Sequence, residues 1–100
     1  MSDSSRFHRL SNELFPTLVQ YVPVVDRVHG NHHPEFHEVR RLFDSICQKT
    51  QASNVKKPDL LEEFSQLQEI TKNYAVPEDV CETYEAVYEM LSQLSVAYKE

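Results

Sequence analysis

Histidine is the residue type whose spacing first suggests chemistry, because four of the five histidines lie in one short stretch. Residues 27–39 read RVHGNHHPEFHEV and contain His29, His32, His33 and His37. Imidazole is a common ligand of Zn and related metals. His33 and His37 are four residues apart, which places side chains on one helix face, although Pro34 puts His33 at the helix edge. Two interpretations stay open: an adventitious Zn or Ni site at His33 and His37, or capping and solvated turn residues.

The other reactive side chains do not form a recognisable catalytic pattern. Neither Cys47 nor Cys81 neighbours a histidine in the sequence, so no Cys–His nucleophile is predicted. We expect two buried, reduced thiols rather than a disulfide, since the cytosol keeps thiols reduced. The sequence has no Gly-rich phosphate loop and gives no basis for predicting an enzyme. We interpret the acids of the predicted helices as a solvated face: Glu62, Glu63, Glu82, Glu85 and Glu89. We interpret the tyrosines of the last helix as core aromatics: Tyr84, Tyr88 and Tyr98.

The histidine-rich stretch is predicted to be the turn of an αα-hairpin. Gly30 follows an apolar run, as a glycine just past a helix end does, and we expect it to have a positive φ. Pro34 suits the first turn of a new helix, where its missing N–H would be unpaired anyway. Glu35 and Glu38 then place negative charge near that helix's N-terminus. The stretch therefore predicts helix, tight turn, helix.

Apolar residues recur every three or four positions through most of the chain, which predicts amphipathic helices. We expect helices at about 5–29, 34–50, 58–74 and 78–99, with breaks near 30–33, 51–57 and 75–77. Pro16 and Pro23 leave two options for the predicted helix at about 5–29: one kinked helix, or a short helix joined to a longer one. The core should include Leu14, Leu18, Phe36, Phe43, Ile46, Phe64, Leu67, Tyr84, Leu91 and Leu94. Four such segments with short connections predict an all-α, antiparallel up-down-up-down four-helix bundle.

Composition limits the classes of protein to be considered. One hundred residues, 40% of them hydrophobic and 26% charged, predict a single globular domain. The net charge of −6 argues against binding to nucleic acid, which calls for a basic surface. No apolar run approaches the ~18 residues of a membrane-spanning helix, and residues 1–10 have no apolar signal core. We therefore expect a cytoplasmic protein that does not act at a membrane.

Two stretches resemble the hemerythrin-like iron–sulfur cluster repair di-iron proteins (the ScdA/Ric family). Residues 8–39, with RVHGNHHPEFHEV, are close to that family's first helical hairpin. Within residues 67–94, ITKNYAVPEDVCETYEAVYEML is similar to its passage from third to fourth helix. The second motif is the more specific one, because it includes polar and turn residues as well as apolar ones.

The resemblance implies a four-helix bundle with a non-haem di-iron centre, serving repair of clusters damaged by nitrosative or oxidative stress. His8 and His29 match two ligand positions of the family. In the family, the second helix carries a His-x-x-x-Glu pair near its end, but residues 53–57 of this chain read SNVKK. The family's third helix opens with a ligand histidine, and the aligned residues here are Lys56-Lys57-Pro58. The fourth helix's ligands would follow Glu100, and a cysteine-containing N-terminal segment is missing. The sequence therefore resembles a shortened member without a complete di-iron site.

Three functional hypotheses follow from the sequence. The first is a shortened member of the repair family that acts in the same stress pathway and has kept a binding role. The second is a small all-α interaction or regulatory module without metal or catalytic activity. In the third, two chains pair to rebuild a metal site. His8 and His29 cannot share an ion unless the prolines fold the helix back, since 21 residues of helix span about 30 Å. We therefore expect no cofactor in one chain, iron only in a rebuilt site, and a protein partner or a homodimer.

Overall fold

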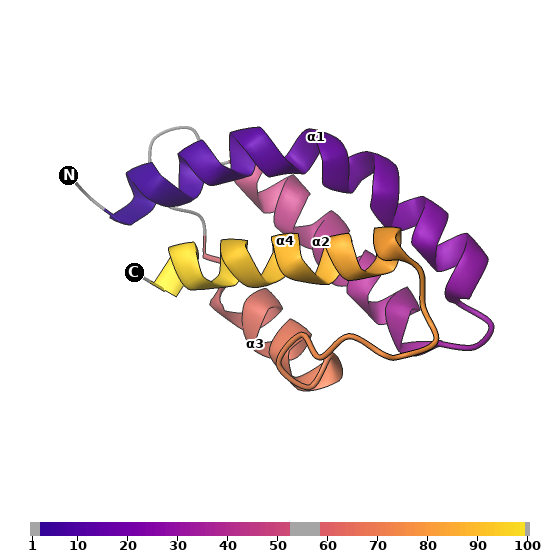
Figure 1. The fold of residues 1–100 in the computed structure, drawn as a ribbon. Coiled ribbons are helices and arrows are strands. Elements are labelled where there is room, and N and C mark those ends of the chain that lie inside the picture. Colours follow the sequence, from indigo (N-terminus) through magenta and orange to yellow (C-terminus); the bar gives the residue numbers. More distant parts are fainter. Residues whose placement is uncertain (1–2, 53–58, 100) are drawn as a thin grey trace.

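The computed structural model describes residues 3–52 and 59–99. Within those ranges the chain forms four helices and no strand, which confirms the predicted all-α class: α1 Asp3–His29, α2 Glu35–Ala52, α3 Leu61–Ile70 and α4 Glu82–Lys99. Helix α1 packs along α4 and also contacts α2, while α2 contacts α3. Figure 1 shows α1 and α4 side by side, with the start of α1 and the end of α4 at one end of the molecule. None of the described helices is long and apolar enough to cross a membrane.

Helix α1 is one continuous helix, which excludes the option of a short helix joined to a longer one. Pro16 and Pro23 both lie inside it. Neither proline is buried, and the core contacts come from other positions of the same helix. Phe7, Leu18, Val22 and Val25 are buried at spacings of 11, four and three residues, each close to a whole number of helical turns. That spacing keeps them on one face, so hydrophobic burial favours the helix where the prolines remove hydrogen bonds.

The core is a single cluster to which all four helices contribute. Of the predicted core residues, Leu14 is half-buried at the edge of this cluster and the others are buried. Phe7 and Leu60 are also fully buried, and Phe7 packs edge-on against Phe64 and Tyr98 with ring centroids 6.2 and 5.4 Å away. The Tyr98 hydroxyl accepts a hydrogen bond from the Leu60 amide at 2.7 Å. The polar end of Tyr98 therefore holds the start of α3 against α4.

The segment between α3 and α4 differs from the prediction. Helix α3 ends at Ile70 rather than at residue 74, and α4 begins at Glu82 rather than at 78. Lys72, Asn73 and Tyr74 have φ angles of 54°, 61° and 62°, a left-handed turn that non-glycine residues rarely adopt. The Thr71 hydroxyl accepts a hydrogen bond from the Tyr74 amide at 2.8 Å. Tyr74 is buried as its spacing predicts, but on a turn instead of a helix.

The second predicted break falls largely on residues 53–58, which lie outside the described residues, and α2 extends to Ala52. The interpretation of the helical acids as a solvated face is wrong for Glu63, which is buried. Its carboxylate accepts a hydrogen bond from the Ser45 hydroxyl at 2.9 Å and lies 2.7 Å from Lys49 Nζ. Burial opposes its ionisation, but these bonds outweigh burial and lower the pKa of Glu63. The remaining helical acids of that group are exposed: Glu62, Glu82, Glu85 and Glu89.

Phe43→Ala tests the orientation of α2. Phe43 is 2% exposed and packs edge-on against Phe15 at 5.7 Å. Removing a fully buried phenyl ring should lower the free energy of unfolding by about 3–5 kcal/mol. Urea denaturation followed by circular dichroism measures the change. Leu61→Ala is the control, because Leu61 is 58% exposed and its removal should have an effect below about 1 kcal/mol. A loss that small at Phe43 would mean that its ring is not part of the core.

Candidate functional site

The densest group of titratable side chains lies where the end of α1 and the start of α2 meet the segment entering α4. We call it the histidine cluster, and its members are His29, His33, Asp79, Cys81 and Tyr84. The rings of His29 and His33 both pack edge-on against Tyr84, with centroids 5.4 and 5.6 Å away. Tyr84 is fully buried and its hydroxyl lies 3.0 Å from that of Tyr88. The two imidazoles are therefore positioned by one buried aromatic ring of α4.

His33 bridges two carboxylates that are far apart in the sequence. Its Nδ1 lies 3.0 Å from Glu35 Oε2, and its Nε2 lies 3.0 Å from Asp79 Oδ1. Burial opposes a charged imidazole, but the bonds to Glu35 and Asp79 outweigh it and raise the pKa of His33 above 6.5. A hydrogen bond from its own backbone lowers the pKa of Asp79, and His33 lowers it further, against the effect of burial. A protonated His33 can donate to both carboxylates, which ties the start of α2 to the segment before α4.

His29 contacts a thiol. Its Nε2 lies 3.2 Å from the Sγ of Cys81, 52 positions along the chain. The prediction that no cysteine forms a Cys–His arrangement is therefore wrong, because it considered sequence neighbours alone. The prediction of two buried thiols is also wrong for Cys81, which is exposed, while Cys47 is half-buried. Both are free cysteines.

The turn at Gly30 is built differently from the prediction. No glycine has a positive φ, and the Gly30 amide donates to the Asp26 carbonyl at 2.9 Å, as a helical residue would. Gly30 is needed for another reason: the ring of His37 lies directly over it. A Cβ there would meet the Asp26 carbonyl oxygen and would lie 2.7 Å from His37 Cε1. The carboxylate of Asp26 in turn contacts His37 Nδ1 and, at 3.1 Å, Arg40.

The described donors do not fit a di-iron centre. His8 lies near the opposite end of α1 from His29, and its ring packs at 6.0 Å from that of Phe7. His33 and His37, the second candidate pair, each contact different carboxylates. Within residues 3–52 and 59–99, no three His, Cys, Asp or Glu side chains are grouped as a metal site requires. The positions aligned with ligands at 53–57 lie outside the described residues.

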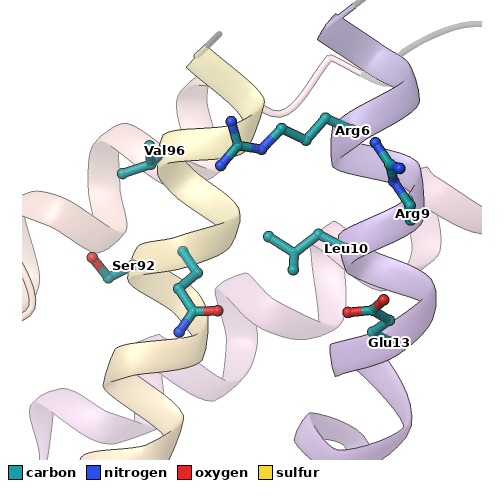
Figure 2. Close-up of a pocket in the computed structure, with 7 residues that line it drawn as sticks. Arg6, Arg9, Leu10, Glu13, Ser92 and Val96 are labelled. Atoms are coloured by element: carbon teal, nitrogen blue, oxygen red, sulfur yellow. The ribbon is translucent and has the colours of Figure 1, made fainter.

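The described surface has hollows at both ends of the α1–α4 pair. One, of about 470 Å³, adjoins the histidine cluster and is lined by His33, Glu35, Lys72 and Tyr88 among others. The second, of about 480 Å³, lies between α1 and α4 near their other ends. Figure 2 shows that Arg6 and Leu10 of α1 reach toward α4 across this groove, with Val96 on the far wall. Its lining combines guanidinium, carboxylate and apolar groups.

Comparisons with known proteins do not identify a relative: no family model, no curated protein and no solved structure matches this chain.

Gly30→Ala tests the close approach of His37. The added Cβ must displace the His37 ring or the Asp26 carbonyl, so we expect a loss of about 1–3 kcal/mol in the free energy of unfolding. In a His37→Ala background the same substitution should cost less, because one of the two obstacles is gone. Thermal or urea unfolding of the four proteins measures this double-mutant cycle. Equal losses in both backgrounds would show that the ring does not constrain Gly30.

His33→Gln tests the carboxylate bridge through its pH dependence. A pKa raised on folding gives stability that is fully present below the unfolded value of 6.5 and is lost as pH rises through the folded pKa. The wild-type free energy of unfolding should therefore fall as the pH rises above about 6.5, and the variant should show a shallower fall. Urea titrations at several pH values measure both. His32→Gln, an exposed change in the same turn, should keep the wild-type slope; equal slopes for wild type and His33→Gln would contradict the bridge.

Proposed function

We propose that the chain is a hemerythrin-like, antiparallel up-down-up-down four-helix bundle related to the iron–sulfur cluster repair proteins. In this proposal it acts in the cytoplasm, in the response to nitrosative or oxidative stress, without a di-iron centre of its own. Its contribution is to bind a protein partner or a second copy. The helical order and the all-α class are compatible with this bundle, and the family assignment depends on the two stretches described above.

One observation supports the proposal more than any other: the two stretches that resemble the family contact each other. His29 and His33 come from the first stretch, and Asp79, Cys81 and Tyr84 come from the second. Their contacts at 3.0 Å and 3.2 Å join segments about half the chain apart. If the two resemblances were unrelated, the two stretches would not have to contact each other. In a bundle of the family's type, the first hairpin and the neighbouring fourth helix would be expected to contact each other.

The arrangement of donors supports a protein that does without iron. A bundle di-iron centre takes several carboxylates and histidines that converge from all helices. Here His29 contacts a thiol, and His33 has a carboxylate at each ring nitrogen. The acids on the outer faces of α3 and α4 are exposed, while Glu63 lies against Lys49. The two histidines and Glu63 already have partners, so we infer a binding role instead of redox chemistry at iron.

The alternative, an interaction module without a role in stress, is favoured by the groove of Figure 2. Its lining includes Val96, which is 55% exposed on α4, and Leu10 of α1. Arg6 and Arg9 lie at the same groove in a chain of net charge −6. An amphipathic segment with acidic residues has the complementary chemistry. Both proposed functions involve binding to a protein partner. They differ in whether that binding serves the stress response.

Iron content tests the metal-free part of the proposal. Protein purified without a His-tag from iron-supplemented cells should be colourless, and its melting temperature should not change with a chelator, because folding does not depend on a metal. Iron analysis, the absorption spectrum and thermal unfolding measure this. About two irons per chain with an oxo-bridged absorption band would contradict it. If iron is found, sedimentation would distinguish a site within one chain from a site that two chains rebuild.

Deletion of the gene in its native host tests the pathway. The deletion strain should recover iron–sulfur enzyme activity more slowly after a nitric oxide donor or peroxide, and the wild-type gene should restore the rate. Recovery after heat shock is the control, because it does not depend on cluster repair. Normal recovery from both oxidants would favour the interaction module.

A further inference from the structure

The Cys81–His29 pair has the geometry of an activated thiol. The Sγ of Cys81 is at a hydrogen-bonding distance of 3.2 Å from His29 Nε2, and the cysteine is exposed. His29 is held in place by the Tyr84 ring, which it meets at an interplanar angle of 88°. With its proton on Nδ1, the imidazole can accept the thiol proton at Nε2. The pair therefore combines solvent access with a positioned base.

Cys81 lies at the N-terminal end of α4. Its carbonyl accepts a hydrogen bond from the Glu85 amide at 3.2 Å, so Cys81 is the residue from which the 18-residue helix begins. The unpaired amides of a helix's first turn stabilise an adjacent anion. The nearby acid Asp79 is paired with His33, which reduces its repulsion of a thiolate.

Cys47 provides an internal reference thiol. It lies half-buried on α2, where burial, with a smaller contribution from the charge of Asp44, raises its pKa to about 11. A thiol of that kind is rarely ionised near neutral pH and reacts slowly. The two cysteines of one chain are therefore expected to differ strongly in reactivity.

We propose that Cys81 is a peroxide-reactive thiol and His29 its general base. The sulfur attacks one oxygen of hydrogen peroxide, the S–O bond forms and the O–O bond breaks. His29 takes the thiol proton and returns it to the departing hydroxide, which leaves as water. The sulfur is oxidised to a sulfenic acid and the peroxide is reduced. This modification site does not depend on the family assignment or on a partner.

The test is the rate of sulfenic acid formation at each cysteine of the purified, reduced chain. Limiting peroxide is added with dimedone as the trap, and peptide mass spectrometry reads both cysteines in one sample. Cys81 should react at least about tenfold faster than Cys47. It should also react faster than the cysteine of a synthetic peptide spanning residues 76–86, which lacks His29.

His29→Gln should slow the reaction of Cys81 by roughly tenfold, since it removes the base. His32→Gln, an exposed histidine of the same turn, should leave the rate unchanged. Circular dichroism establishes whether each variant is folded. If His29→Gln unfolds, the wild-type comparison with the peptide decides. A native Cys81 that reacts no faster than the peptide, or a folded His29→Gln with the wild-type rate, would overturn the proposal.

Discussion

The packing of Tyr84 is the contact on which the histidine end of this molecule depends. Four rings surround it, from the end of α1, the turn, the start of α2 and the next turn of α4, with centroids 4.9–5.6 Å away: His29, His33, Phe36 and Tyr88. Such ring pairs contribute roughly 0.5–1.5 kcal/mol each beyond simple burial. Burial raises the pKa of Tyr84 and of Tyr88, so both hydroxyls stay neutral and can hydrogen-bond to each other. One side chain thereby joins three helices and orients two imidazoles toward solvent-accessible partners.

Hydrophobic spacing predicted burial well and backbone conformation less well. The three- and four-residue spacing located core residues such as Phe43, Phe64 and Leu91, because a face of a helix must be apolar to pack. At Tyr74 the same spacing predicted burial correctly and the helix wrongly. The spacing of apolar residues indicates which side chains are buried. The left-handed turn at Tyr74 depends on hydrogen bonds such as the one from the Tyr74 amide to the Thr71 hydroxyl. Sequence periodicity carries no information about those bonds.

The residues that sequence reasoning missed are those whose partners lie far along the chain. Asp79 could be recognised as part of a helix start signal, but its contact with His33 spans 46 positions. Cys81 and His29 are 52 positions apart, and the search for a Cys–His pair considered sequence neighbours. Glu63 was misread for the same reason, because Ser45 and Lys49 reach it from α2. Gly30 shows the reverse case: the position was correctly singled out, while the cause is the ring of His37 and not the backbone angle.

The pairing of the histidines links stability to metal affinity. A ligating imidazole must present an unprotonated nitrogen to the ion, and in His33 both nitrogens contact carboxylates. A metal at His33 would therefore have to displace Glu35 or Asp79 and would lose the bridge between α2 and the segment before α4. His37 has a similar constraint, since its Nδ1 contacts Asp26 over Gly30. In a chain of net charge −6, a protonated His33 compensates the charge of the two carboxylates that it contacts. Histidine spacing that resembles a ligand set can therefore arise from hydrogen bonds that stabilise the hairpin.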